Sequence, residues 1–329
     1  MAKQTINYQD VVDNVINELL ENGEWDGRFA GYADDIEKYG DEYSRKRKYF
    51  RVKAPLYAYT SISKVGGSCQ YDLRFKGQSV ATVSVDKTGP VTISTVGKDK
   101  SNEGYFGCTS KHQLPDNTNW DNPKAIGFRK HFRDISSSVK AKSPEHSHES
   151  MLLSHFRKSK SGDKKILNIQ PVLLSGQFFQ MPTAISASKT DKIKHSRDGG
   201  GIDILARVRK GSQSTLTIIE LKDEKNWEER PEIAIKQAIA YATFILFLLR
   251  SKSGDKWWKI FRFGGNVPEE LTVYAVVAMP GIKEEDRDFV GEELKVVNMG
   301  RDKIKLYHIT YSEQNYELQH IETSIPECK

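Results

Sequence analysis

The chain has 329 residues, of which 37% are hydrophobic and 29% charged, and its formal net charge is +6 at pH 7. This length allows one large or two smaller domains, and the apolar share is sufficient for a folded core. A run of about 18 uncharged apolar residues is absent and the first residues lack an apolar signal segment, so we expect neither a membrane span nor export. The three cysteines lie far apart without a CxxC pair, which favours a reduced, cytoplasmic protein without a structural zinc knuckle.

The N-terminal part of the chain begins with a helical pattern and continues as short strands. Six apolar residues recur at helical spacing before Gly23: Val11, Val12, Val15, Ile16, Leu19 and Leu20. After a charged stretch ending in "SRKRKYF", the runs "LYAYTSI", "CQYDLRF", "SVATVSV" and "PVTISTV" are typical of an antiparallel meander. Residues 97–124 have the composition of a loop. We therefore predict an α+β, mainly antiparallel domain over residues 1–135, whose role the sequence does not indicate.

A stretch of small, polar and proline residues, 136–147, is predicted to be a linker. Beyond it, the pattern predicts a helix in "HESMLLSHFRKS", strands in "ILNIQPVLLSGQFFQMPTAIS", a hairpin, and a helix from Pro231 to about Arg250. A buried strand "LTVYAVVAM", a helix "EEDRDFVGEELK" and a last strand "KIKLYHITY" follow. This order predicts an α/β domain over residues 148–329, with a mixed sheet flanked by helices.

The hairpin is formed by "IDILARV" and "TLTIIELK", which flank Gly211-Ser212. Glycine at the first position of a two-residue loop favours a type II′ turn. With this loop, Asp203 lies opposite Glu220 on one face of the sheet, and Lys222 shares that face. Two opposed carboxylates repel each other, and a divalent cation between them would remove the repulsion.

These side chains suit the metal-dependent hydrolysis of a phosphodiester. The carboxylates of Asp203 and Glu220, with the backbone carbonyl of Leu221, are ligands that Mg²⁺ or Mn²⁺ prefers. The metal would activate a water molecule and neutralise phosphate charge, and Lys222 would orient that water or stabilise the transition state. Composition alone also allows a surface hairpin in which Lys222 forms a cross-strand ion pair with one of the acids.

The same residues resemble a known family. "GID", ending in Asp203, and "IIELK", ending in Lys222, resemble the core of the PD-(D/E)xK nuclease superfamily, which has the restriction-endonuclease-like fold. Gln237 and Tyr241 in "QAIAY" match the QxxxY helix motif of its RecB-like and λ-exonuclease-like branch. The resemblance covers about residues 147–311 and nothing earlier in the chain. No proline precedes Asp203, a departure at a position that varies in the family.

The resemblance implies a role for each of these residues. In the family, residues matching Asp203 and Glu220 bind the metal, and the residue matching Lys222 assists the attacking water. Residues matching Gln237 and Tyr241 lie beside the site.

The family also commonly carries a glutamate on the helix before the sheet. Glu149 is the candidate for this position, with Glu145 as the alternative. A glutamate in the first turn of a helix is equally favoured by the helix dipole, without any catalytic role.

The sequence therefore predicts a metal-dependent nuclease that acts on nucleic acid, with DNA as the expected substrate. The first alternative is a nuclease-like domain that binds nucleic acid or a protein partner without cutting. A second alternative is a hydrolase of another phosphodiester on the same scaffold. No membrane partner is expected, and a homodimer remains open.

Basic residues are concentrated around the hairpin. Residues 136–225 contain 16 lysines and arginines against 9 acidic residues, whereas the rest of the chain has 34 against 35. The loop before the hairpin is predicted to contact phosphates through Lys189, Lys192, Lys194 and Arg197. Glycines 199–201 would let a backbone approach the catalytic strand closely.

Further along the chain, "KWWKIFRF" interleaves aromatic and basic residues. Packing of the aromatic residues against the sheet is favoured over stacking on bases.

Overall fold

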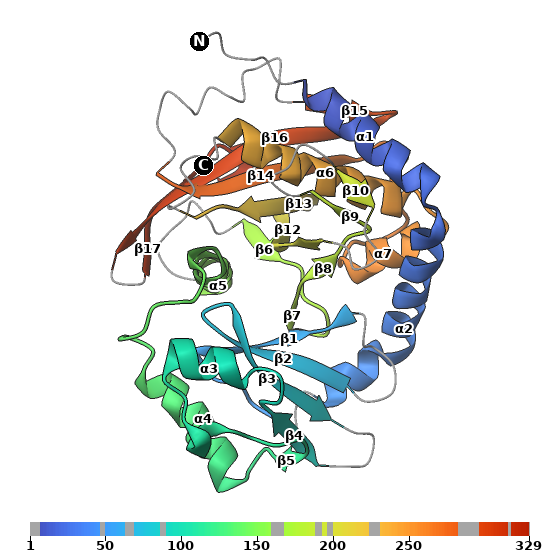
Figure 1. Cartoon of the computed structure of the whole chain (residues 1–329). Coiled ribbons are helices and arrows are strands. Elements are labelled where there is room, and N and C mark those ends of the chain that lie inside the picture. Colours follow the sequence, from blue (N-terminus) through green and yellow to red (C-terminus); the bar gives the residue numbers. More distant parts are fainter. Residues whose placement is uncertain are drawn as a thin grey trace. The chain divides into compact units, whose positions relative to one another are not determined.

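The computed structural model describes residues 7–46, 50–62, 69–85, 90–158, 168–187, 193–195, 200–223, 231–281, 296–314 and 317–328 (Figure 1). The chain forms a mixed α/β protein with two mixed sheets flanked by helices. It divides into two compact units: unit 1 contains residues 1–33, 152–172 and 181–329, and unit 2 contains residues 34–151 and 173–180. The units therefore interleave along the sequence, and the predicted domain boundary at 136–147 stays a prediction for proteolysis to test.

The sheet of unit 1 has the strand order β15-β16-β14-β13-β12-β6, and β17 also pairs with β16. Strands β13, β14 and β16 run parallel, whereas β6, β12 and β13 are successively antiparallel. The bounds are β6 Ile169–Pro171, β12 Ile204–Lys210, β13 Gln213–Leu221, β14 Thr272–Pro280, β15 Val296–Met299, β16 Asp302–Gln314 and β17 Glu317–Thr323. The strand predicted to be the last, β16, is thus followed by one more.

Two short ladders complete the strands of unit 1. In one, β8 (Met181–Pro182) pairs with β11 (Gly201–Ile202), and in the other β9 (Ile185–Ser186) pairs with β10 (Lys194–His195). Both are antiparallel, and β11 leads directly into the hairpin strand β12.

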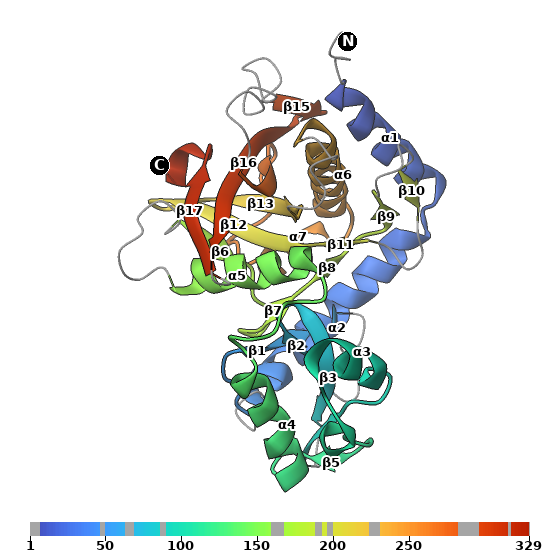
Figure 2. The same ribbon diagram turned by 60° about the vertical axis from the view of Figure 1, so that its left-hand side comes forward.

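The helix predicted from Pro231 is confirmed: α6 (Pro231–Leu249) packs on β13, β14 and β16 (Figure 1). It is long and apolar enough to cross a membrane, but most of it is buried inside unit 1, which identifies it as a core helix. The helix predicted from the spacing of apolar residues near the N-terminus is confirmed as α1 (Tyr8–Glu21). It contacts α6 (Figure 2). The short helix α7 (Gly254–Ile260) carries Trp257, which is fully buried, and Phe261, directly after it, is fully buried as well. Both rings are therefore buried in unit 1, and Trp257 packs on Phe29 and Phe261, which agrees with a packing role rather than with stacking on bases.

The β12–β13 hairpin has the predicted register. Ile204 pairs with Ile219, and the ladder continues to Lys210 opposite Gln213, so that the loop is Gly211-Ser212. Gly211 has a φ of +60°, which the first position of a type II′ turn requires. The backbone bends at Asp203, so the ladder ends one residue before the Asp203–Glu220 pair that a regular hairpin would contain.

Unit 2 contains the predicted meander. Its sheet has the order β5-β4-β3-β2-β1-β7, and all neighbours are antiparallel except β1 and β7. The bounds are β1 Leu56–Thr60, β2 Cys69–Phe75, β3 Gln78–Val85, β4 Val91–Ser94, β5 Thr118–Asn119 and β7 Phe178–Phe179. Helices α3 (Asp99–Phe106) and α4 (Pro123–Asp134) cover the sheet, and Phe75, Phe106 and Phe132 form an aromatic cluster in the core.

Several helices were not predicted. The prediction that residues 97–124 are a loop is wrong, because α3 forms there and ends at Gly107 in the left-handed conformation. A buried amide, that of Asn102, fixes α3 by donating to the Val80 carbonyl at 2.9 Å. Helix α2 (Glu24–Lys46) lies in the charged stretch for which the sequence predicts no helix.

The sequence predicts neither helix, and the reason is the same for both: each contains many charged residues and glycines, so its few apolar residues do not form a clear helical pattern. In α2 the buried residues, at spacings of three or four, are Trp25, Phe29, Ala33 and Ile36. Helix α5 (Pro144–Lys158) begins inside the predicted linker, and the helix predicted in "EEDRDFVGEELK" lies outside the described residues.

Candidate functional site

The two predicted metal-binding carboxylates lie together in unit 1. Asp203 sits at the bend between β11 and β12, and its Oδ2 accepts a hydrogen bond from the Leu221 backbone N–H at 2.9 Å. Glu220 lies near the end of β13 and is only 2% exposed. One carboxylate oxygen of Asp203 is within 4.8 Å of one of Glu220. The bend thus turns Asp203 toward the neighbouring strand and keeps the pair close without a regular ladder.

Lys222 follows β13 directly and is 6% exposed. Its backbone N–H donates to the Ala278 carbonyl on β14 at 3.0 Å, and its Nζ donates to Oε1 of Gln237 at 2.7 Å. The alternative of a solvated surface hairpin is therefore wrong at this end, because both Glu220 and Lys222 are buried.

The two residues of the predicted QxxxY motif lie one turn apart on α6. Gln237 Nε2 donates to the Tyr241 hydroxyl at 3.4 Å, which extends the chain of polar contacts from Lys222. Burial, and then the negative charge of Glu220, raise the pKa of Tyr241 to about 12. Tyr241 therefore keeps its proton at neutral pH.

Gly200 lies against the hydroxyl group of Tyr241. A Cβ atom at Gly200 would lie 2.5 Å from the Tyr241 hydroxyl oxygen, far inside van der Waals contact. The backbone of Gly200 is fixed on both sides, since its N–H donates to Ile185 O at 3.0 Å and its carbonyl accepts from Thr183 N at 2.9 Å. Gly200 thus lies against Tyr241, and the predicted approach of a backbone to the catalytic strand stays a prediction.

Only part of the predicted phosphate-contacting loop can be placed. Lys194 lies on β10 opposite Ser186 and is exposed. Lys189, Lys192 and Arg197 lie outside the described residues. The role of this loop stays a prediction.

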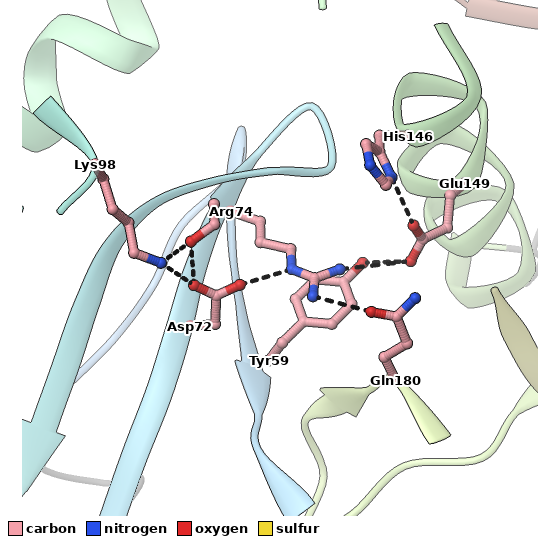
Figure 3. A network of polar contacts seen from close by, with 8 residues as sticks. Tyr59, Asp72, Arg74, Lys98, His146, Glu149 and Gln180 are labelled. Atoms are coloured by element: carbon pink, nitrogen blue, oxygen red, sulfur yellow. Dashed lines mark hydrogen bonds and ion pairs between the residues drawn. The ribbon is translucent and has the colours of Figure 1, made fainter. Parts of the chain in front are cut away.

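The predicted helix glutamate takes part in a different network, within unit 2 (Figure 3). Glu149 Oε1 accepts a hydrogen bond from the Tyr59 hydroxyl at 3.4 Å and lies 4.0 Å from Nη1 of Arg74. Oε2 of Glu149 is 3.7 Å from Nδ1 of His146. Burial, and then the charge of Glu149, raise the pKa of Tyr59 well above its ordinary value. Glu145 also belongs to unit 2, and a catalytic role for either glutamate stays a prediction.

Arg74 is the centre of this network, and the sequence analysis missed it. Its Nε donates to Asp72 at 2.8 Å, its Nη2 donates to Gln180 at 3.3 Å, and its guanidinium lies 4.2 Å above the Tyr59 ring (Figure 3). Lys98 donates to Asp72 at 2.7 Å. Burial alone would raise the pKa of Asp72, but Arg74 and Lys98 hold it below its ordinary value. The available signal was the pairing of Asp72 and Arg74 on one face of "CQYDLRF".

A second cluster of possible metal ligands lies in unit 2. One atom each of Cys108, His112 and His131 lie within 4.8 Å of one another. However, His112 Nδ1 accepts the Thr109 N–H at 3.0 Å, and His131 Nε2 bonds the Phe106 carbonyl at 2.7 Å. The two rings stack at 4.2 Å and 33°, whereas imidazoles bound to one tetrahedral ion converge on it. Burial raises the pKa of Cys108 to about 11, and His112 forms a capping box with Thr109, so we interpret the histidine as a helix cap.

Comparison of the chain with family models, with curated proteins and with solved structures finds no match. The function is therefore inferred from the geometry of the site itself.

Proposed function

We propose that the chain is a metal-dependent nuclease of the PD-(D/E)xK type and that unit 1 has the restriction-endonuclease-like fold. The order of the main elements supports this: α5 precedes the antiparallel strands β6, β12 and β13, with the short strands β7 to β11 between β6 and β12, and α6 and the parallel strand β14 come after them. The carboxylates stand at the end of the central hairpin, and the QxxxY helix packs beside them. DNA is the proposed substrate.

The donor set fits Mg²⁺ or Mn²⁺. Asp203 and Glu220 provide hard carboxylate oxygens within 4.8 Å of each other, and Leu221 provides a backbone carbonyl next to them. When bound, the ion would supply Lewis acidity and neutralise charge on a phosphate oxygen. No thiol or imidazole belongs to this proposed ligand set, which disfavours a zinc or copper site.

The neighbouring residues orient the reacting groups. Lys222 is held at 2.7 Å from Gln237, so its ammonium is fixed in direction while other N–H bonds remain for a water molecule or a phosphate oxygen. Tyr241 remains protonated and places a neutral hydroxyl beside Gln237. Burial of Glu220 and Lys222 restricts access of bulk water, which strengthens these electrostatic interactions.

The single observation that carries the proposal is the approach of the Asp203 and Glu220 carboxylates at the hairpin end, with Lys222 buried beside them. The test incubates the protein with linear and circular DNA in Mg²⁺, Mn²⁺ or EDTA. Asp203→Ala, Glu220→Ala and Lys222→Ala should each reduce cleavage by about 100-fold or more. Glu269→Ala, which removes an exposed carboxylate from unit 1, is the control and should cleave normally.

Cleavage in EDTA, or full activity of Asp203→Ala, would contradict the proposal. DNA binding without cleavage under any of these metal conditions would favour the nuclease-like binding domain instead. Cleavage of a small phosphodiester but not of DNA would favour the hydrolase alternative.

A further inference from the structure

Three arginines of unit 1 gather away from the carboxylates. Arg207 and Arg209 lie on β12, two residues apart and thus on the same face of the strand. Nη1 of Arg207 donates to the backbone carbonyl of Arg262, just after α7, at 2.7 Å. Arg262 and Arg209 are exposed, and Arg207 is half-buried. We call these three residues the arginine cluster.

Within the described residues, the cluster has no counter-charge. Among the residues that the structure describes, none of the three guanidinium groups forms an ion pair with a carboxylate. Nε of Arg207 is buried and has no hydrogen-bond partner. Burial, and then repulsion from Arg262 and Arg209, lower the pKa of Arg207. Three like charges held together in this way are destabilising for the protein alone, and an anion would relieve the repulsion.

The local structure holds the cluster in place. Phe263 stacks on Trp258 with ring centroids 4.0 Å apart and planes at 16°, and the Arg207 guanidinium lies 5.9 Å from the Phe263 centroid. Trp258 Nε1 in turn donates to the Gly264 carbonyl at 3.1 Å. Arg262 has a φ of +68°, a conformation that a long side chain rarely adopts. This backbone strain at an exposed arginine is of the kind that accompanies ligand-binding sites.

We propose that the arginine cluster binds consecutive phosphate groups of the nucleic-acid strand that enters the active site. Planar guanidinium groups match the oxygens of a phosphate in fork geometry, and three of them suit a repeating anion better than a single one. Arg207 follows Asp203 by four residues on the same strand run, which is about 13 Å in extended backbone. A strand held by the cluster can therefore extend to the carboxylates.

This inference rests on the proposed function for the identity of the polyanion, but it is tested without catalysis. Binding of a fluorescent oligothymidine is measured by anisotropy in EDTA, over a series of salt concentrations. The triple variant Arg207→Gln, Arg209→Gln, Arg262→Gln should bind at least about tenfold more weakly, and its slope of log affinity against log salt should flatten by about 2, or about 0.7 per contact. The matched control, Arg301→Gln, Lys303→Gln, Lys305→Gln, removes the same charge from unit 1 around β16.

Two further variants separate the effect of the arginine cluster from the effects of net charge and of cleavage. Phe263→Leu leaves every charge in place and should weaken binding severalfold, because Arg207 loses the ring beside it. Asp203→Asn should retain the arginine-dependent binding even though it loses cleavage, so a failed nuclease assay and a failed cluster give different results.

An unchanged salt slope in the triple variant, with a melting temperature equal to that of the wild type, would overturn the inference. Equal weakening by the β16 control would do the same, since it would show that only net charge matters. Binding of polyglutamate that depends equally on the three arginines would overturn the assignment to nucleic acid.

Discussion

Each unit holds a pair of carboxylates of which one is buried and one half-buried, but the charged groups around the two pairs differ. In unit 2, Asp72 and Glu149 flank Arg74, and Lys98 adds a second cation at Asp72. Two acids thus meet two bases within the same unit. In unit 1, Asp203 and Glu220 approach within 4.8 Å of each other.

The surroundings of Lys222 in unit 1 differ from those of Arg74. Lys222 donates to the neutral amide of Gln237 at 2.7 Å. Asp203, Glu220 and Lys222 comprise two acidic groups and one basic group, whereas Asp72, Glu149, Arg74 and Lys98 comprise two of each. A balanced network stabilises the fold by itself, and an excess of negative charge at a buried site attracts a cation. We therefore propose that the ratio of acidic to basic groups, rather than burial of the acids, distinguishes the candidate metal site from the Arg74 network.

The largest effect is expected from breaking the balanced network. Arg74→Met should lower the free energy of unfolding of unit 2 by about 3 kcal/mol, because Glu149 stays buried without the guanidinium. Urea denaturation measures this loss, and Arg74→Lys should recover only part of it, since lysine lacks the planar fork. The double variant Arg74→Met, Glu149→Gln should be more stable than Arg74→Met alone. A loss below about 0.5 kcal/mol would mean that the network is not structural.

A smaller effect of opposite sign is expected at the hairpin. Asp203→Asn keeps an oxygen that can accept the Leu221 N–H but removes one of the two facing charges. In EDTA the variant should be as stable as the wild type or up to about 1 kcal/mol more stable. The increase in melting temperature that Mg²⁺ gives the wild type should disappear in the variant. If the variant is clearly less stable than the wild type in EDTA and is still stabilised by Mg²⁺, the proposal that the two carboxylates repel each other and bind the ion is wrong.

The smallest effect concerns His146. Its contact with Glu149 raises its pKa above the ordinary value of 6.5, against the opposing effect of burial. Its stabilising contribution is therefore fully present below pH 6.5 and is lost as the pH rises through the folded-state pKa. Because 46% of the side chain is exposed, His146→Gln should lower stability by only a few tenths of a kcal/mol at about pH 5.5. At pH 8 the two proteins should have equal stability, and an equal difference at both pH values would exclude this contact as the cause.

Most of the hairpin site could be predicted because its determinants are local. Gly211 sets the turn, the turn sets the register, and the register brings Asp203 and Glu220 to the same end. The four-residue spacing of Gln237 and Tyr241 likewise places both on one side of α6. The buried bond from Lys222 to Gln237 was not predicted, because it depends on how α6 packs on β13.

The sequence by itself determined the elements with strong periodicity: α1, the four-strand meander of unit 2, the hairpin, α6 and β14. Turn residues and alternation act over a few residues and need no tertiary partner to be recognised. Only the tertiary structure decided that Glu149 joins Arg74, and that Arg262 meets Arg207, because these pairs are separated by 75 and 55 residues in the chain. It also decided the weakly apolar helices α2 and α3, whose few buried side chains become stabilising only once their tertiary partners are in place: α6 and α7 for Trp25 and Phe29, and β3 for Asn102.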